Sequence, residues 1–392
     1  MAYCTHCKGN LVNVIDLKEI PIVNNFINNK STKKIKTKIS ICKKCKLFQH
    51  ENIIKKKEIF NKYYPYISSS SQELIKHFKY IHKKIDYIDK KFLLEIGSND
   101  GSFLKHLKKK ITHLGVDPSK IACKEARNKK LNVINDFFSF KLSKKILKKY
   151  GHADIIFSAN TLAHVENLND ILKGIDLLLS KKGILYIENI YLQSLLKNNL
   201  YDQLYHEHIY TYSIESVNNI FSKYNLYIDK VSFNKMQGGS FLIKLTRKNK
   251  DRKNIIKIIK NENNEYLFKK NTKILINKKI NLSLSKLKKF IQEINSNNIP
   301  ITGYGASAKC VMIVNLLGLN KKNLKFIVDN TKYKQNKPIP GTNIPIISPK
   351  KISNYLGKYC VIFSWNFVKE IINKEKKINK NTKWVIPMPK LK

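Results

Sequence analysis

The sequence has no apolar run close to the roughly 20 residues that a helix needs to span a bilayer. Hydrophobic residues nevertheless make up 42% of the composition, which is enough to form buried cores. These two features exclude a membrane span and a disordered tail. The amino terminus, Met1 to Cys7, lacks the basic start and the apolar core of a secretory signal. We therefore expect a cytoplasmic protein with reduced thiols.

Acidic residues are scarce, because 28 Asp and Glu stand against 75 Lys and Arg, giving a formal net charge of +47. Such a charge is compatible with nucleic-acid binding, since clustered basic side chains neutralise phosphates. The basic residues are instead spread over every segment, and Lys far outnumbers Arg. This profile favours a general compositional bias with a preference for anionic ligands. We expect a protein that binds neither nucleic acid nor membranes.

The central part of the chain shows short apolar stretches that alternate with amphipathic helices. This alternation predicts a parallel, doubly wound α/β sheet. Two strand-like stretches, 226–233 and 240–245, follow with no helix between them and suit an antiparallel hairpin at the sheet edge. The predicted parallel strands are 92–96, 112–116, 131–134, 154–158 and 184–188.

A charged, Lys-rich stretch from 251 to 298 predicts helices that connect two lobes. A second Rossmann-like α/β unit follows it, with a helix at 307–317 and strands at 299–303, 324–328, 360–364 and 383–386. A chain of 392 residues is long enough for three domains. We expect them at 1–75, 76–250 and 251–392.

Four of the seven cysteines fall within the first 45 residues, as Cys4-x-x-Cys7 and Cys42-x-x-Cys45. Each pair places two thiolates about one turn apart, as a tetrahedral Zn²⁺ site requires. The polar stretch between the pairs has little apolar periodicity, so it needs a staple to fold. The spacing predicts a structural zinc site, with redox pairs or unrelated buried thiols as the alternatives.

The segment from Glu95 to Gly101 follows the first predicted parallel strand and opens a helix. Its glycines permit a tight turn against a ligand, and Asp117, after the second strand, can accept both ribose hydroxyls of a nucleoside. A third glycine of the dinucleotide pattern is missing, which favours S-adenosylmethionine over NAD, with a ligand-free sheet as the remaining alternative. The predicted cofactor-binding residues are Glu95, Gly97, Asn99, Gly101, Asp117, Asp136 and Asn160.

The segment 201–208 lies beyond the fifth strand and is dense in polar and aromatic titratable groups. Loops at the carboxyl ends of parallel strands commonly carry the chemistry of such folds. A histidine can abstract a proton near neutral pH, and a neighbouring Glu can orient it. A single histidine would favour a structural role; the cluster favours a catalytic one.

Taken in order along almost the whole chain, these motifs resemble the sugar-nucleotide C-methyltransferase family. The motifs that carry the resemblance are the paired cysteines, 63–69, Glu95-x-Gly97, 160–164, 205–208, 238–240, 303–306, 328–330 and 340–345. The family combines a zinc-binding amino-terminal region, a methyltransferase core and a carboxy-terminal Rossmann-like domain. The resemblance implies addition of a methyl group at C3 of a nucleotide-linked 4-keto-6-deoxyhexose.

The resemblance also implies roles for individual residues. His208 would be the base that forms an enolate, Glu207 its polarising neighbour and Tyr205 a donor near the sugar. Tyr63 or Tyr64 are alternatives to Tyr66 in its register. The implied substrate-binding residues are Tyr66, His164, Tyr304 and Lys309.

Two glycine motifs leave alternatives open. The family usually has an Arg soon after Gly238-Gly239-Ser240, whereas this chain continues with apolar residues, so the substrate can differ in detail or the glycines can simply shape a strand end. The loop from Gly303 to Lys309 joins a strand to a helix and suits a phosphate, although it also suits packing alone. An O- or N-methyltransferase on a related sugar nucleotide is the alternative function, followed by a zinc-containing nucleic-acid-binding protein. We expect a monomer.

Overall fold

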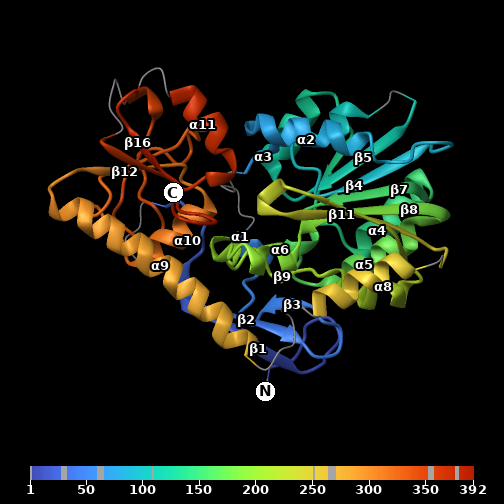
Figure 1. Ribbon diagram of the computed structural model, residues 1–392. Coiled ribbons are helices and arrows are strands. Elements are labelled where there is room, and N and C mark those ends of the chain that lie inside the picture. The colour runs from blue at the N-terminus through green and yellow to red at the C-terminus, as the bar shows by residue number, and fades with distance from the viewer. Residues whose placement is uncertain are drawn as a thin grey trace.

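A computed structural model describes residues 2–27, 33–59, 66–107, 110–249, 252–263, 271–351, 357–375 and 379–392. Two α/β lobes stand side by side, and a small antiparallel sheet lies below them (Figure 1). We call these parts the central lobe, the carboxy-terminal lobe and the amino-terminal sheet. In the part of the chain that is described, no helix combines the length and the apolar character needed to cross a membrane.

The central lobe is built on a sheet in which seven strands are described. The strand β4 is buried along its whole length, as expected for a parallel strand covered on both faces. The predicted edge hairpin is confirmed, since β10 and β11 pair antiparallel and β10 is the edge strand. The spatial order is β10 (Tyr227–Asn234), β11 (Ser240–Thr246), β8 (Leu179–Ile190), β7 (Ala153–Ala159), β4 (Phe92–Ile96), β5 (Thr112–Asp117) and β6 (Val133–Asn135).

The helices of the central lobe begin where the sequence supplies capping side chains. Ser71, Ser119, Ser139 and Ser213 each accept a hydrogen bond from a backbone N–H in the first turn. These caps fix the helix starts and thereby the loops at the sheet edge. The helices are α2 (Gln72–His82), α3 (Lys120–Asn128), α4 (Phe140–Tyr150), α5 (Leu168–Leu178), α6 (Leu192–Lys197), α7 (Ile214–Phe221) and α8 (Lys253–Glu262).

The amino-terminal sheet contains two long strands that the sequence analysis did not predict. Leu11–Pro21 (β1) pairs antiparallel with Lys34–Cys42 (β2), and β1 buries Ile15 and Ile20 completely. The sheet continues through β3 (Phe48–His50) to β9 (Tyr210–Thr211), and a short helix, α1 (Lys56–Ile59), follows β3. We call residues 201–208 the histidine segment; because β9 follows it almost directly, this segment is anchored in the amino-terminal sheet.

The carboxy-terminal lobe is the second parallel α/β unit that the sequence predicts. All of its described strand pairs are parallel, in the order β14 (Ile346–Ile347), β13 (Ile327–Val328), β12 (Ile301–Tyr304), β15 (Tyr359–Ile362) and β16 (Lys383–Val385). The strand β14 was not predicted. The helices are α9 (Thr272–Ser296), α10 (Ala308–Leu317) and α11 (Val368–Glu375).

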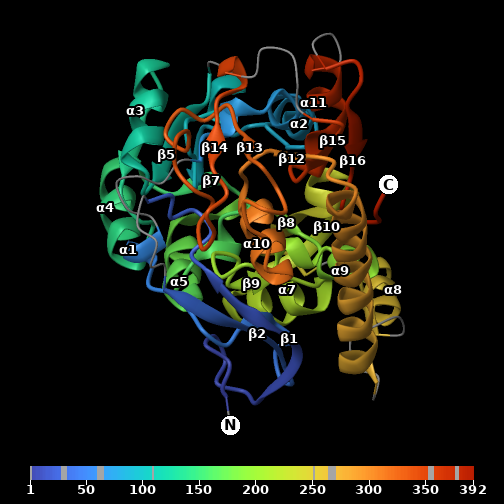
Figure 2. The same ribbon diagram turned by 90° about the vertical axis from the view of Figure 1, so that its left-hand side faces the viewer.

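The long helix α9 ties the lobes to the amino-terminal sheet. It runs along the outside of the molecule from the carboxy-terminal lobe to β1 (Figures 1 and 2). One apolar cluster contains Ile15 of β1, Leu196 of α6, Ile280 of α9 and Met312 of α10. Residues from all three predicted domains therefore share a core, so the domain limits near 75 and 250 stay predictions.

Candidate active site

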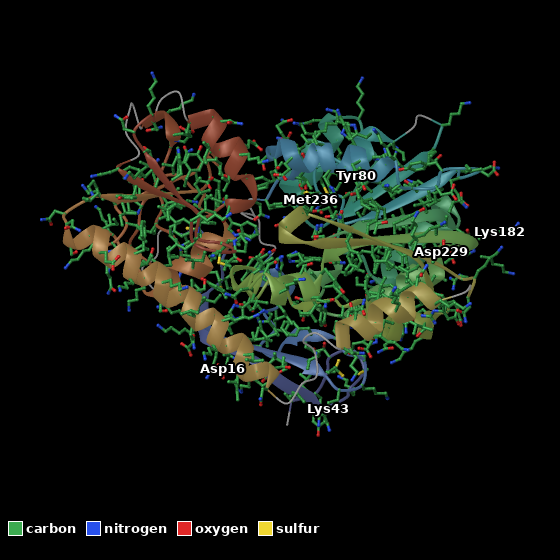
Figure 3. All side chains as sticks on the ribbon, in the orientation of Figure 1. Asp16, Lys43, Tyr80, Lys182, Asp229 and Met236 are labelled. Atoms are coloured by element: carbon green, nitrogen blue, oxygen red, sulfur yellow. The ribbon has the colours of Figure 1, made fainter. Side chains whose placement is uncertain are left out.

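A cavity of about 390 Å³ opens between the central lobe and the carboxy-terminal lobe. Its walls come from the carboxyl ends of the parallel strands, from the histidine segment and from the start of α10. Met236, at the turn between β10 and β11, lines it and lies on the side of the central lobe that faces the other lobe (Figure 3). The predicted site residues that line the cavity are Tyr66, Glu95, Gly97, Asn99, Asp117, Asn160, His164, Tyr205, Glu207, His208 and Lys309.

Gly97 occupies a turn that admits no side chain. Its φ is +78°, and an added Cβ would lie 1.9 Å from Thr161 Oγ1. The backbone N–H of Gly97 donates to Val116 O at 2.8 Å, which closes the turn onto β5. Gly97 thus lets two strand ends approach each other beside the cavity.

Asp117 ends β5 with its carboxylate on the cavity wall. Oδ2 accepts a hydrogen bond from the N–H of Asn99 at 2.9 Å, and Oδ1 accepts from the N–H of Ser119 at 2.8 Å. Burial raises the pKa of Asp117. Each carboxylate oxygen can accept more than one hydrogen bond, so Asp117 retains capacity for the hydroxyls of a ribose. The turn at Gly97 and this carboxylate fit the nucleoside end of S-adenosylmethionine.

Glu95 and Asn160 complete the same wall. Burial, and secondarily the charge of Asp117, raises the pKa of Glu95 well above its usual value. Asn160 follows β7 with a φ of +52°, and its N–H donates to Glu188 O at 2.7 Å. Both residues flank the strand ends where the cofactor is expected.

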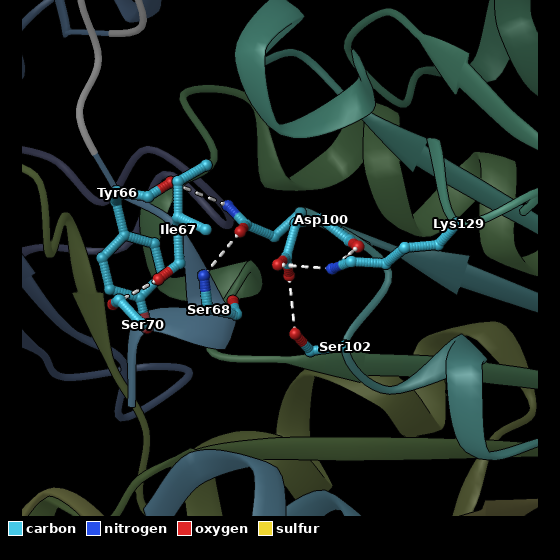
Figure 4. A network of polar contacts seen from close by, with 8 residues as sticks. Tyr66, Ile67, Ser68, Ser70, Asp100, Ser102 and Lys129 are labelled. Atoms are coloured by element: carbon cyan, nitrogen blue, oxygen red, sulfur yellow. Dashed lines mark hydrogen bonds and ion pairs between the residues drawn. The ribbon is translucent and has the colours of Figure 1, made fainter. Parts of the chain in front are cut away.

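Asn99, in the turn from Glu95 to Gly101, joins this turn to the segment that carries Tyr66. Asn99 Oδ1 accepts from the N–H of Ser68 at 2.8 Å, and its Nδ2 donates to Tyr66 O at 3.2 Å (Figure 4). The next residue, Asp100, is fully buried and accepts from Lys129 Nζ at 2.8 Å. Tyr66 is thereby held at the cavity rim, whereas Tyr63 and Tyr64, its alternatives, lie outside the described residues.

Three of the predicted cofactor-binding and substrate-binding residues do not line the cavity. Asp136 is exposed, and its Oδ1 accepts from the N–H of Phe137, which lines the cavity in its place. Gly101 faces Leu131, whose Cδ1 would lie 2.2 Å from an added Cβ. Tyr304 points into the core of the carboxy-terminal lobe and donates to Glu375 at 2.8 Å. Local hydrogen bonding or packing thus directs each of these residues away from the cavity.

His208 is held as one defined neutral tautomer. Its Nδ1 lies 2.8 Å from Gln203 O, a carbonyl that can only accept, so Nδ1 carries the proton. Nε2 therefore has a lone pair, to which the Tyr205 hydroxyl donates at 2.9 Å. Burial, aided by the neighbouring His164, lowers the pKa of His208 well below its usual value. The ring is poised as a base at Nε2.

Glu207 is held from the amino-terminal segment. Both of its carboxylate oxygens accept from Asn24 Nδ2, at 2.9 and 2.8 Å. Gln203 and Tyr205 make the hydrogen bonds that orient His208. His164 lies edge-on to His208 with ring centroids 4.9 Å apart, and burial lowers the pKa of His164 to about 4. Two neutral imidazoles therefore face the cavity together.

Lys309 supplies a cation on the cavity wall that the carboxy-terminal lobe forms. Its Nζ donates to Gln237 Oε1 at 3.1 Å and to Asn366 Oδ1 at 2.6 Å. Burial lowers the pKa of Lys309 to about 8, although Asp202 opposes the shift. Lys334 and the amino-terminal end of α10 line the same wall. This wall suits an anion such as a phosphate.

Several cavity residues were not predicted. Glu188 Oε1, at the end of β8, lies 2.6 Å from His77 Nε2, and both residues line the cavity. A carboxylate at the end of a predicted strand, as at Asp117, was a usable signal for Glu188. His77, Asn24 and Gln237 had no such signal, because they reach the cavity only through long-range packing.

The four amino-terminal cysteines come together as predicted. Their Sγ atoms all lie within 4.8 Å of one another, and they are the one such metal-binding group found in the described part of the chain. The chain turns tightly after each pair, with positive φ angles at Lys8 and Lys46. Four thiolates at this spacing fit a tetrahedral Zn²⁺ ion. His6 is not part of the group.

Three protein families match successive parts of the chain. They are a zinc binding domain at residues 4–60, a methyltransferase domain at 72–231 and a C-methyltransferase C-terminal domain at 235–389. The chain is also 25% identical over 360 residues to the C-methyltransferase NovU of Streptomyces niveus, covering 90% of this chain and 86% of NovU.

Solved methyltransferase structures resemble a part of the chain. A methyltransferase from Anabaena variabilis is 15% identical with a TM-score of 0.36, covering 45% of this chain and 84% of its own. One from Archaeoglobus fulgidus is 18% identical with a TM-score of 0.37, covering 44% and 94%. These scores are low, and the assignment rests on the family matches. The chain is an S-adenosylmethionine-dependent C-methyltransferase with a zinc-binding amino-terminal domain, a methyltransferase core and a C-methyltransferase carboxy-terminal domain, and it is a distant relative of NovU.

Proposed function

We propose that this enzyme methylates C3 of a nucleotide-linked 4-keto-6-deoxyhexose. The observation that carries the proposal is the neutral His208, whose Nε2 lone pair lies in the same cavity as Asp117 and the turn at Gly97. A ketone at C4 acidifies the proton on C3, and a neutral imidazole is a suitable base for it near pH 7.

In the proposed reaction, each of the cavity residues has a different role. The C3–H bond breaks, its proton goes to His208 Nε2, and its electron pair forms an enolate with the negative charge on the C4 oxygen. The Tyr205 hydroxyl, which caps Nε2 before substrate enters, then donates to that oxygen. Bound S-adenosylmethionine supplies the methyl group as an electrophile. Glu207 and His164 line the cavity beside His208.

The opposite wall favours a nucleotide diphosphate on the substrate. Lys309 and Lys334 place two cations there, next to the start of α10. NovU carries the name C-methyltransferase, which supports carbon over oxygen or nitrogen as the methylated atom. We propose a monomer in the cytoplasm, where reducing conditions suit a four-cysteine site. The products would be branched deoxysugars for a polysaccharide or a glycosylated metabolite.

Hydrogen exchange at C3 tests the base directly. The enzyme is incubated in D₂O with the keto sugar nucleotide and S-adenosylhomocysteine, and loss of the C3 proton signal is followed by NMR. We expect exchange with the native enzyme and its loss in His208→Asn. The exposed His152→Asn is the matched control and should exchange at the native rate.

The product identifies the atom that is methylated. With a ¹³C-labelled methyl donor, and a sugar labelled at C3, a carbon-bound methyl gives one-bond carbon–carbon coupling and survives mild acid. An O-methyl or N-methyl product, or a native enzyme that exchanges no C3 proton, would overturn the proposal.

A further inference from the structure

We propose that Gln203 and Gln237 are positioning residues through which Lys309 of the carboxy-terminal lobe sets the orientation of His208. The inference rests on the proposed function, because it assigns Lys309 to the substrate anion and His208 to the base. Gln203 and Gln237 are neither predicted cofactor-binding residues nor predicted catalytic residues.

Three hydrogen bonds, linked through the side chains and backbone carbonyls of two glutamines, connect Lys309 to His208. Lys309 Nζ donates to Gln237 Oε1 at 3.1 Å, and Gln237 O accepts from Gln203 Nε2 at 2.6 Å. Gln203 O then accepts from His208 Nδ1 at 2.8 Å. The cation and the base, 101 residues apart, are thus connected through two glutamines.

The middle of this connection is held in a restricted conformation. Gln237 has a φ of +53°, an uncommon conformation for a residue with a side chain. The following Gly238 also has a positive φ, and an added Cβ would lie 2.6 Å from Leu200 and 2.8 Å from Trp365. Packing on both sides therefore holds the Gln237 carbonyl against Gln203 while no anion is bound at Lys309.

A second contact fixes the other end. Trp365 Nε1 donates to Asp202 Oδ2 at 2.6 Å, next to Gln203, and Lys309 Nζ lies 4.7 Å from the Trp365 ring centroid. Gln203 is buried, and its carbonyl belongs to the short helix Tyr201–Gln203. The carboxy-terminal lobe thus holds the backbone that carries Gln203 O, which accepts the hydrogen bond from His208 Nδ1.

The hydrogen bond that orients His208 therefore depends on whether an anion is bound at Lys309. An anion at Lys309 competes with Gln237 Oε1 for the ammonium protons. Gln237 Oε1 then moves toward Asn366 Nδ2, which already donates a hydrogen bond to it at 2.9 Å. The displacement reaches Gln203 through the Gln237 carbonyl and changes the hydrogen bond that holds His208.

Four variants test the connection. Gln237→Met removes the acceptor for Lys309, and Gln237→Asn shortens the side chain in case the first variant folds poorly. Gln237→Glu keeps an acceptor oxygen for Lys309; its added charge weakens anion binding but should restore exchange at saturating substrate. The exposed Gln292→Met on α9 is the control. We expect C3-proton exchange at saturating substrate to fall about tenfold in Gln237→Met and Gln237→Asn, within the range of measured couplings. Gln237→Glu and Gln292→Met should stay within threefold of native.

A second readout does not depend on turnover. The ¹⁵N signals of His208, assigned with His208→Asn, are recorded before and after addition of thymidine diphosphate. We expect the nucleotide to shift them in the native enzyme and to leave them unchanged in Gln237→Met, whose melting temperature and nucleotide affinity are measured alongside.

The two proposals fail in different ways. A native enzyme that shows the nucleotide-dependent shift but no C3 exchange would refute the proposed reaction and leave the connection standing. Equal shifts in native and Gln237→Met, no shift in the native enzyme, or exchange at the native rate in both Gln237→Met and Gln237→Asn would overturn the connection.

Discussion

The amide of Asn24 donates to both carboxylate oxygens of Glu207, at 2.9 and 2.8 Å, across 183 residues of sequence. This contact fastens the segment after β1 to the residue preceding His208. The amino-terminal sheet therefore closes one side of the active site, in addition to holding the cysteine cluster. Both residues line the cavity.

Loss of this clamp should destabilise the protein and its active site together. Asn24→Ala leaves the buried Glu207 without its two amide hydrogen bonds, which typically costs about 1–3 kcal/mol. We expect a lower free energy of unfolding in urea and slower methyl transfer. Asn52→Ala removes a single hydrogen bond of an exposed Asn and should change neither by much. Equal effects of the two substitutions would contradict the clamp.

Asp117 should contribute much of the affinity for the cofactor's nucleoside. Asp117→Asn replaces a charged acceptor, and hydrogen bonds to charged groups are worth roughly 1.5–3 kcal/mol. We expect the dissociation constant of S-adenosylhomocysteine, measured by calorimetry, to rise about 10- to 100-fold. Asp136→Asn, outside the cavity, should leave it within twofold. A reversed order of the two variants would restore Asp136 as the cofactor ligand.

The pKa of Lys309, which burial lowers to about 8, makes nucleotide binding pH-dependent. The ammonium form is lost as the pH rises through 8, so thymidine diphosphate should bind more weakly at pH 9 than at pH 7. Binding near pH 8 should also take up a proton, which calorimetry in two buffers detects. Lys309→Met should bind weakly at both pH values. The exposed Lys369→Met should behave as the native enzyme, and a pH-independent native affinity would refute the assignment.

The cysteine cluster should stabilise the amino-terminal sheet through a bound metal. Cys4, Cys42 and Cys45 are buried within an apolar cluster that also contains residues of the central lobe. Cys7→Ser removes one of four ligands, so we expect loss of about one zinc per chain by elemental analysis and a fall in melting temperature. Strong chelators should have the same effect on the native enzyme. Cys123→Ser, outside the cluster, should retain the metal.

Buried histidines should make the fold sensitive to acid. Burial lowers the pKa of His206 to about 4, whereas an unfolded chain has its usual value near 6.5. The unfolded state therefore binds the proton first, and the stability contributed by neutral His206 is present above pH 6.5 and lost as the pH falls toward 4.

Urea unfolding at pH 7.5, 6 and 5 measures this effect. His206→Gln should lose about 1.4 kcal/mol less stability per pH unit than the native protein below pH 6. Both proteins keep the same cysteine cluster, so metal loss cancels in the comparison. His152→Asn, at an exposed position, should show the native slope, and an unchanged slope in His206→Gln would contradict the prediction.

The sequence determined the features whose geometry is local. The two Cys-x-x-Cys pairs each form a tight turn, and a turn needs only the residues within it. Gly97 and Asp117 sit at the ends of adjacent parallel strands, so the alternation of strands and helices was enough to place both at one sheet edge. His208 and Tyr205 lie three residues apart and share a hydrogen bond for the same reason.

Only the tertiary structure decided the contacts between distant segments. The sequence offered no reason to join Asn24 to Glu207 or Lys309 to Gln237, because such pairs depend on how whole lobes pack. It suggested Asp136 and Tyr304 from their position after a strand or in a loop, yet a local hydrogen bond and a buried partner direct these side chains elsewhere. The sequence specifies which groups are available at strand ends and turns, and long-range burial selects which of them face the cavity.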